Sequence, residues 1–542
     1  MRGARSAKWV AGAIVVALAA TACGGDGDGD SGDKKDKKAA APQVVMELGE
    51  PQNGLIPSNT YESEGSEVMN ALFTGLVRYD EKNQTQLDMA ESIETTDNKV
   101  WTIKIKPGYT FHNGEKVTAE SYVNAWNYGA NQDNTQETNP LYAKISGYAD
   151  LNPGEKKKPA TDKLKGLQVV DESTFKVTLD APFSAFKTLL GFNAFYALPK
   201  VFFDDPKAFE TAPVGNGPFK MSGKFEHNVQ IKTVKYAKHP DAGKIKVGGV
   251  TFKIYTDQET AYRDLQGGTV DIMDTLPVSA LGTAKRELGD RYITGVDSAV
   301  AYIGFDNSTL KATDADTRKA ISMAIDRKSI TEKVFLGATT PADDFINPLV
   351  PGNRKGACTA CAYDPAEAKK LYDSAKGLPG DTLNLAYNAD GDHKTWIEAV
   401  ANQLEENLDI KVTVQPKEQF ATILDELGDK KYKGAFRLGW SMDYPSAENY
   451  LRPIFSEEAI ENGSNYSGYV NKDVEKYLDQ ADQAPSAEEA LSLYQKADDV
   501  ILSEMPYLPI YFYARNAGLS KDIKSATIDS MAQVDWTSVT PS

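Results

Sequence analysis

The spacing Ser184-Ala-Phe-Lys187 is the one in this chain that most resembles a catalytic motif. It matches the Ser-x-x-Lys of penicillin-recognising enzymes, but the Ser-Asp-Asn and Lys-Thr-Gly motifs that accompany it there do not occur. A Gly-x-Ser-x-Gly elbow, a His-Glu-x-x-His zinc motif and a phosphate-binding P-loop are also missing from the sequence. We therefore expect a binding protein with no enzymatic activity and no cofactor.

Cysteine chemistry offers a second possibility, because Cys358 and Cys361 form a Cys-x-x-Cys pair. Such a pair can be half of a zinc site, but the complementary pair is missing. A redox pair would open a helix after a strand, whereas this one lies among Pro351, Gly352 and Gly356, in an expected loop. In an exported protein a local disulfide between the two is the best interpretation. The four histidines do not have metal-ligand spacing either, so we expect no metal site (His112, His227, His239 and His393).

The first residues have the pattern of an export signal. Three basic residues precede an apolar run over residues 9–20, which is shorter than the roughly 20 residues of a membrane-spanning helix. Ala20-Thr-Ala-Cys23 then resembles the lipobox of bacterial lipoproteins, in which the cysteine is diacylated and becomes the new N-terminus. The usual first residue of that motif is Leu. We expect a signal peptide over 1–22 and a lipid on Cys23; ordinary cleavage near Ala22, giving a freely secreted protein, is the alternative.

Composition limits what the rest of the chain can be. Residues 23–42 alternate Gly with Asp and then carry lysines, so they bury no apolar surface and are expected to form a disordered tether. A formal charge of −17 argues against nucleic-acid binding, which needs clustered Lys and Arg. The remaining 500 or so residues are too many for one hydrophobic core, so at least two lobes are expected. No second segment is long and apolar enough to cross a membrane.

Hydrophobic periodicity predicts alternating strands and helices. Trp101-Thr-Ile-Lys-Ile-Lys alternates apolar and polar residues, which is typical of a half-buried strand. The next segment, 118–128, has helical spacing, and Thr118 and Ser121 can cap its N-terminus. Strand–helix alternation over so long a span predicts the α/β class. Further strands are expected at 44–48, 174–179, 250–255, 383–387 and 410–414, and helices at 62–72, 259–265, 318–325, 365–375 and 395–404.

Motifs in a consistent order cover nearly the whole mature chain. They include Ala71-Leu-Phe-Thr-Gly-Leu-Val-Arg-Tyr-Asp80, Trp101 to Gly114 (WTIKIKPGYTFHNG), Val214-Gly-Asn-Gly-Pro-Phe-Lys220, Arg318-Lys-Ala-Ile-Ser-Met-Ala-Ile-Asp-Arg327 and Tyr363-Asp-Pro-Ala-Glu-Ala-Lys-Lys-Leu371. In this order they resemble family 5 solute-binding proteins, the extracytoplasmic receptors of peptide and nickel ABC importers.

The resemblance implies a two-lobe clamshell of the periplasmic-binding-protein type, with an extra inserted subdomain in the first lobe. Most of the quoted motifs are then scaffold; Asp326 and Arg327, for example, are expected to form a structural ion pair. The predicted organisation is a first lobe in three parts (43–62, 195–298 and 509–542), an inserted subdomain (63–194) and a second lobe (299–508).

The resemblance also implies ligand contacts. Gly439-Trp-Ser-Met-Asp-Tyr-Pro445 matches the family segment whose aspartate binds the ligand's free α-ammonium, and that position is Asp443. A desolvated carboxylate forms a strong, charge-assisted hydrogen bond with an ammonium. A turn-forming aspartate is the structural alternative. The other expected peptide-binding residues, for several of which a packing role is as reasonable, are Trp440, Ser441, Tyr61, Glu62, Ser63, Tyr142 and Asn465.

The expected function is that of a lipid-anchored receptor on the outer face of a bacterial membrane. It would act as a monomer, capture oligopeptides in the cleft and pass them to the permease subunits of an ABC importer. A free amino terminus is the charge shared by ordinary peptides, which favours a peptide ligand if Asp443 has the role stated above. Nickel, an opine or a sugar derivative in the same fold is the alternative, and a surface chaperone or adhesion protein without transport is an alternative of another class.

Overall fold

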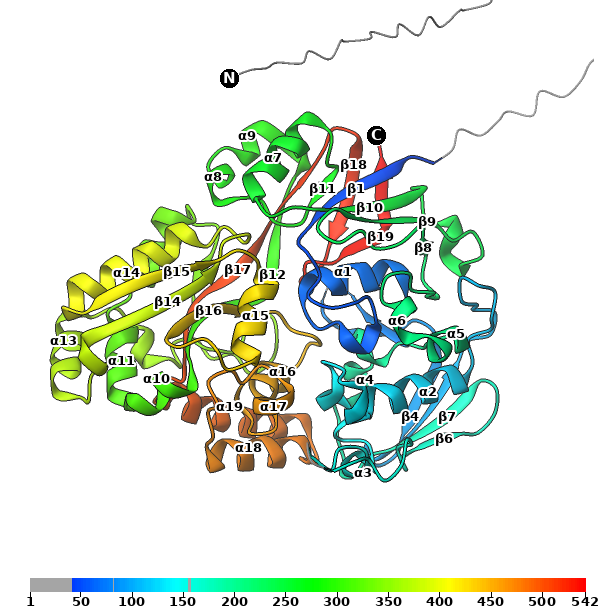
Figure 1. Cartoon of the computed structure of the whole chain (residues 1–542), viewed down its shortest axis with the longest axis horizontal. Coiled ribbons are helices and arrows are strands. Elements are labelled where there is room, and N and C mark those ends of the chain that lie inside the picture. Colours follow the sequence, from blue (N-terminus) through cyan, green and yellow to red (C-terminus); the bar gives the residue numbers. More distant parts are fainter. Residues whose placement is uncertain (1–40, 81, 155–156) are drawn as a thin grey trace, which may run out of the picture. The chain divides into compact units, whose positions relative to one another are not determined.

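Two long antiparallel strands, β12 (Tyr292–Phe305) and β17 (Tyr507–Leu519), run side by side through the middle of the protein (Figure 1). The computed structural model describes residues 41–80, 82–154 and 157–542, and residues 41–542 form one unit. The predicted signal peptide, the lipidation site Cys23 and all but the last two residues of the predicted tether lie outside the described residues.

Both strands belong to an 11-stranded mixed sheet that extends through the two halves of the unit. We call the half that contains β1 the first lobe and the half that contains β14 the second lobe. A short strand, β13 (Thr340–Pro341), pairs with β17 beside the main path. Along that path the order is β15 (Lys411–Lys417), β14 (Thr382–Asn388), β16 (Ala435–Trp440), β12, β17, β11 (Ile272–Met273), β1 (Gln43–Leu48), β10 (Gly249–Ile254), β9 (Gln230–Lys235) and β8 (Phe219–Met221).

Each of the two long strands contributes to two hydrophobic cores. In β12, Ile293 packs against the core of the first lobe and Val300 is buried in the core of the second. In β17, Phe512 belongs to the second core and Leu519 to the first. Two separate cores joined by shared strands make a two-lobe architecture, as the resemblance implied.

The first lobe carries a subdomain built on a four-stranded sheet. Its strand β5 is the predicted alternating strand at Trp101, and helix α2 (Ala119–Ala130) begins at the predicted cap, since Thr118 and Ser121 bond each other's backbone N–H groups. The strand order in this sheet is β4 (Ala90–Thr95), β5 (Val100–Ile105), β7 (Thr174–Thr178) and β6 (Leu167–Val169). Two further pairs of antiparallel strands form separate two-stranded sheets: β2 (Val77–Tyr79) with β3 (Thr85–Leu87), and β18 (Ile523–Ile528) with β19 (Val534–Pro541).

Helices of the first lobe precede β12. The longest besides α2 are α1 (Ser63–Leu72) and α7 (Gln258–Gly267). The shorter ones are α3 (Tyr148–Leu151), α4 (Phe186–Leu189), α5 (Lys200–Asp204), α6 (Pro206–Phe209), α8 (Val278–Leu281) and α9 (Ala284–Leu288).

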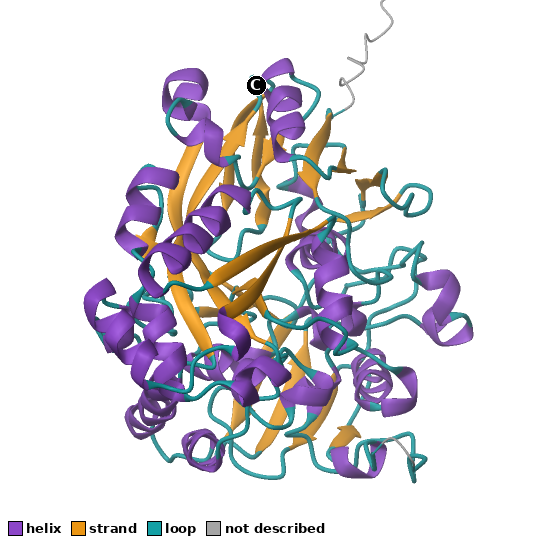
Figure 2. Ribbon diagram, turned by 60° about the vertical axis from the view of Figure 1, so that its left-hand side comes forward, coloured by secondary structure: helices purple, strands orange, loops and turns teal. Residues whose placement is uncertain are grey.

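Most helices of the second lobe lie beside its strands. Figure 2 shows helices along one side of the long strands. The helices of the second lobe are α10 (Asn307–Ala312), α11 (Ala315–Met323), α12 (Arg327–Ser329), α13 (Pro365–Ser374), α14 (Lys394–Leu408), α15 (Phe420–Gly428), α16 (Ala447–Phe455), α17 (Ala459–Asn462), α18 (Lys472–Asp482) and α19 (Ala487–Glu504). Every strand and helix predicted above has a counterpart whose ends lie within four residues of the predicted ones, which confirms the α/β prediction. The predicted domain boundaries stay a prediction.

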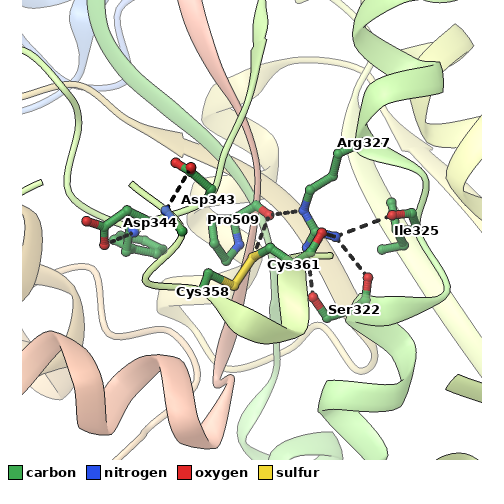
Figure 3. Close-up of a disulfide and its surroundings, with 10 residues drawn as sticks. Ser322, Ile325, Arg327, Asp343, Asp344, Cys358, Cys361 and Pro509 are labelled. Carbon is green, nitrogen blue, oxygen red and sulfur yellow. Dashed lines mark hydrogen bonds between the residues drawn. A yellow bond between two sulfur atoms is a disulfide. The ribbon is translucent and has the colours of Figure 1, made fainter. Parts of the chain in front are cut away.

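The cysteine pair lies in a loop of the second lobe, where the structure joins Cys358 and Cys361 by a disulfide (Figure 3). The guanidinium of Arg327 fixes this loop against β17, because it donates to the carbonyl of Cys361 at 3.2 Å and to that of Pro509 at 2.8 Å. The expected ion pair between Arg327 and Asp326 is wrong. Asp326 instead accepts from the backbone N–H of Ser329 at 2.9 Å and caps α12.

Candidate functional site

The loop after β16 places Asp443 between the two lobes. The Asp443 carboxylate accepts a hydrogen bond of 2.7 Å from Asn449 Nδ2 in α16, and Asn449 Oδ1 accepts from the Asp443 backbone N–H at 2.8 Å. This double contact fixes the loop. Across the lobes, the hydroxyl of Tyr61 donates to the same carboxylate at 3.3 Å. Sequence reasoning predicted Asp443 and Tyr61 as neighbours of a ligand but missed Asn449, the residue that orients the carboxylate.

Burial makes the carboxyl group of Asp443 a weaker acid when no cation lies beside it. It raises the pKa of Asp443 to about 7, and the nearby charge of Glu448 adds to the effect, although the hydrogen bonds from Asn449 and Tyr61 oppose it. A cationic group beside the carboxylate would favour its ionised form. The site is therefore suited to accept an ammonium group.

Tyr61 and Trp440 form an aromatic contact between the lobes. Their ring centroids lie 5.9 Å apart with an edge-to-face orientation, and Tyr61 also meets Phe192 edge-to-face at 5.7 Å. Trp440 is buried and donates from Nε1 to Asn449 Oδ1 at 3.3 Å. Trp440 therefore supports Tyr61 and Asn449, and its expected contact with a ligand stays a prediction.

Two cavities adjoin this contact. The smaller, of about 630 Å³ including its opening, is lined by Tyr61, by Tyr444 and by parts of the subdomain and of α16. The larger, of about 1570 Å³ including its opening, is lined by Ser63 at the start of α1, by Ser441 and by both long strands. Asp443 lies in the chain between Ser441 of the larger cavity and Tyr444 of the smaller one, and is itself in neither lining.

Glu62 has a structural role in α1. Its carboxylate accepts from the backbone N–H groups of Gln52 at 2.9 Å and Gly65 at 3.1 Å, which caps the helix and fixes the preceding loop. Burial raises the pKa of Glu62 to about 7 despite these two bonds. With both oxygens engaged by the backbone, Glu62 positions its neighbours Tyr61 and Ser63.

Tyr142 and Asn465 are buried and bonded within the protein. The hydroxyl of Tyr142 donates to the carbonyl of Ala194, beneath the subdomain surface. Asn465 donates to the carbonyls of Ser456 and Tyr469, both at 2.8 Å. The described residues that line the two cavities do not include either side chain. Their expected contact with a ligand stays a prediction.

Several polar contacts also join the lobes. Besides Tyr61 and Asp443, Lys144 of the subdomain forms an ion pair with Asp482 at the end of α18. Two amide contacts lie elsewhere along the cleft: Gln52 Nε2 donates to Asp425 at 3.3 Å, and Gln419 Nε2 donates to Asn228 at 3.0 Å. The two amide contacts are exposed, and exposed polar contacts contribute little stability each.

Metal chemistry has no support within the part of the chain that the structure describes, where no three His, Cys, Asp or Glu residues are grouped as ligands. Burial lowers the pKa of His393, which lines the larger cavity, well below its ordinary value. In the same described ranges, no helix has both the length and the apolar character needed to span a bilayer.

Comparisons with known proteins agree on one family. The family model "Bacterial extracellular solute-binding proteins, family 5 Middle" matches residues 84–462. The chain is similar to the oligopeptide-binding protein OppA of Bacillus subtilis, with 27% identity over 541 residues and 96% of each chain covered. Its structure resembles the murein tripeptide binding protein MppA of Escherichia coli (TM-score 0.83, 23% identity, 92% of this chain and 98% of that one). It also resembles OppA of Haemophilus influenzae in complex with RPPGFSPFR (TM-score 0.81, 23% identity, 92% and 98%).

Proposed function

Because the chain belongs to the bacterial extracellular solute-binding proteins of family 5, we propose that it captures oligopeptides between its lobes and delivers them to the membrane subunits of an ABC importer. The named function of the Bacillus subtilis relative and the peptide in the Haemophilus influenzae complex support a peptide ligand. The two cavities, which lie between elements of both lobes, supply the space.

The observation that carries the proposal is the environment of Asp443. Its carboxylate is oriented by Asn449, reached by Tyr61 from the other lobe, and has a pKa raised to about 7 by burial. The α-ammonium of a peptide supplies the missing positive charge and up to three N–H donors. The bound peptide then continues from Asp443 into the cavity beside Ser441 or the one beside Tyr444.

The fold supports capture by closure. The polar contacts between the lobes break when the lobes open, while β12 and β17 keep the lobes connected. A ligand held at Asp443 touches both lobes and so adds contacts that exist only in the closed form. Ligands that bind one conformation better shift the population toward it, and the closed form is the one presented to the importer.

The N-terminal residues complete the proposal. Cys23 is diacylated and becomes the new N-terminus when residues 1–22 are removed, and residues 23–42 are a tether that keeps the receptor at the outer face of the membrane. Two acyl chains are needed for stable anchoring. Detergent extraction of the membrane fraction followed by intact-mass measurement tests this: Cys23→Ala should lose the lipid mass and leave the membrane, and an unmodified Cys23 in the parent protein would contradict it.

Calorimetry tests peptide capture directly. The protein from residue 41 onward, which forms one unit with its own cores, is titrated with a tri- to pentapeptide pool and with the same pool acetylated at its N-termini. Free peptides should bind, and acetylation or Asp443→Asn should each weaken binding about 10- to 100-fold, the value of a hydrogen bond to a charged group. Asp162→Asn, an exposed carboxylate of the subdomain, is the matched control.

Two outcomes separate the parts of the proposal. Equal binding of free and acetylated peptides would assign Asp443 a structural role while leaving peptide binding in place. A protein that binds neither pool would contradict the peptide ligand altogether.

A further inference from the structure

The walls of the larger cavity carry more carboxyl groups than cationic groups. Two guanidinium groups face it, those of Arg437 and Arg515. Burial keeps His393, the other titratable nitrogen base of the lining, in its neutral form. The lining contains six carboxylates, those of Glu47, Glu64, Asp274, Asp297, Asp390 and Asp392.

Both guanidinium groups are already engaged by the protein. Arg515 forms an ion pair of 2.7 Å with Asp297. Arg437 donates to the side-chain oxygen of Asn388 at 3.0 Å and to the hydroxyl of Tyr513. The charge of Arg515 also opposes the effect of burial on the pKa of Asp274, and the Nε atoms of both guanidinium groups are buried without a hydrogen-bond partner among the described residues.

Two of the remaining carboxylates are held by backbone N–H groups. Asp390 accepts from Phe420 at 2.9 Å, and Asp392 accepts from Val278 at 2.7 Å. The other three, Glu47 on β1, Glu64 in α1 and Asp274 after β11, form what we call the acidic wall. Among the described residues, no cation lies within 4.0 Å of any of them.

The acidic wall contains acceptors without donors. Glu47 is only 4% exposed, and its carboxylate accepts one long hydrogen bond of 3.3 Å, from Gln258 Nε2. Within the described part of the chain, Glu64 Oε2, Gln258 Oε1 and Thr339 Oγ1 are buried and have no hydrogen-bond partner, and all three residues line this cavity. A buried acceptor without a donor is costly. A ligand that brings several N–H donors and a positive charge would satisfy these atoms together.

Repulsion among the carboxylates of the acidic wall also favours a bound cation. Burial and the charges of Asp274, Glu64 and Asp390 raise the pKa of Glu47 well above its ordinary value. Burial and the neighbouring charge of Glu62 raise the pKa of Glu64 to about 8. A bound cation opposes each of these effects.

We propose that the acidic wall is a subsite for the cationic side chain of a bound peptide, so that the receptor prefers peptides containing Lys or Arg. This inference rests on the peptide binding proposed above and adds a selectivity to it. An ammonium offers three donors and a guanidinium five, enough to reach Glu47, Glu64 and the free oxygen of Gln258 at once.

The test compares peptides that differ only in charge. Tetra-alanine is made with one Lys at position 2, 3 or 4, and each peptide has a counterpart with Nε-acetyl-lysine and another with Glu at the same place. Calorimetry on the protein from residue 41 onward gives the three affinities for each position. At one or more positions, Lys should bind at least about tenfold more tightly than acetyl-lysine, and Glu more weakly still.

Variants locate the effect. Glu47→Gln and Asp274→Asn should each reduce the preference for Lys over acetyl-lysine about tenfold, a larger effect than either has on the affinity for tetra-alanine. Glu94→Gln removes the same charge from the exposed face of β4 and should change nothing. The peptide comparison on the parent protein stands even where a variant fails to fold.

Three results overturn the inference and are distinguishable. If the Lys and acetyl-lysine peptides bind equally well at all positions, the cationic subsite is refuted. The proposed function still holds in that case, provided that tetra-alanine binds. A preference for Lys that survives Glu47→Gln and Asp274→Asn places the selectivity elsewhere. Failure of every peptide to bind refutes the proposed function and, with it, this subsite.

Discussion

The raised pKa of Asp443 predicts that peptide binding weakens sharply in acid. In the free protein this carboxyl has a pKa of about 7, because it is buried and lies near the charge of Glu448. Below that pH it is protonated and neutral, so it no longer attracts an α-ammonium. The perturbation is therefore a change of pH from 7.5 to 5, with tetra-alanine as a ligand that has no ionisable side chain.

The magnitude follows from proton linkage. A ligand that binds only the ionised carboxyl loses apparent affinity about tenfold for each pH unit below a pKa of about 7. Between pH 7.5 and pH 5 the dissociation constant should therefore rise about 10- to 100-fold. At pH 6 most of the free protein has this proton, so binding should release about one proton per peptide. Above pH 8 the peptide's own amino group loses its charge, since its ordinary pKa is about 8.

Calorimetry in buffers of different ionisation enthalpy counts the protons directly. The parent protein should show the release at pH 6, and Asp443→Asn should show weak binding, little pH dependence and no such release. Other carboxyl groups with raised pKa values, above all Glu62 and Glu64, could also release protons on binding. The variant keeps these groups, so the difference in proton release between the parent protein and the variant belongs to Asp443. An observed enthalpy at pH 6 that is the same in all buffers would refute the reasoning, as would an equal proton release by the variant.

The remaining predictions concern the frame around the site. Lys144→Met removes the ion pair with Asp482 between the lobes, so peptide affinity should fall a few-fold, by about 0.5–1 kcal/mol. Small-angle scattering of the peptide-bound variant should also show a larger fraction of open molecules. Unchanged affinity would mean that this ion pair does not favour closure. Arg354→Met leaves the fully buried carboxylate of Asp498 without its 2.8 Å partner, so the free energy of unfolding should fall by about 3–5 kcal/mol in denaturant titrations. The exposed Lys224→Met is the control and should leave it unchanged. Cys358→Ser opens a loop of only a few residues and should cost about 2 kcal/mol in the same assay, with peptide affinity unchanged because the described cavity linings include neither cysteine.

Elements with strong local signals could be predicted from the sequence. The alternation at Trp101 and the cap at Thr118 depend on residues close together in the chain, and both elements appear where expected. Family motifs then indicated the two-lobe arrangement. No strand was predicted where β12 lies, because its second half is a continuous buried run in which period-2 alternation is lost.

The site was predictable only where it lies within one segment. Asp443 follows from the motif that contains it, but Asn449 contributes through a contact that forms once the loop folds back on α16. The acidic wall had no local signal at all, since Glu47 and Asp274 come from strands far apart in the sequence. Arg327 was paired with its neighbour in sequence, whereas burial directs its guanidinium to the carbonyls around it.

The pairing of β12 with β17 shifts register at two places, between Ala301 and Tyr302 and, over a wider gap, between Val296 and Val300. Residues Asp297 and Ala299 in that gap line the larger cavity, and Asn347 donates to both of their carbonyls. An irregularity of this kind lets a sheet bend locally. Because β12 and β17 connect the two lobes, this irregularity lies on the connection between the lobes and in the wall of the larger cavity at the same time.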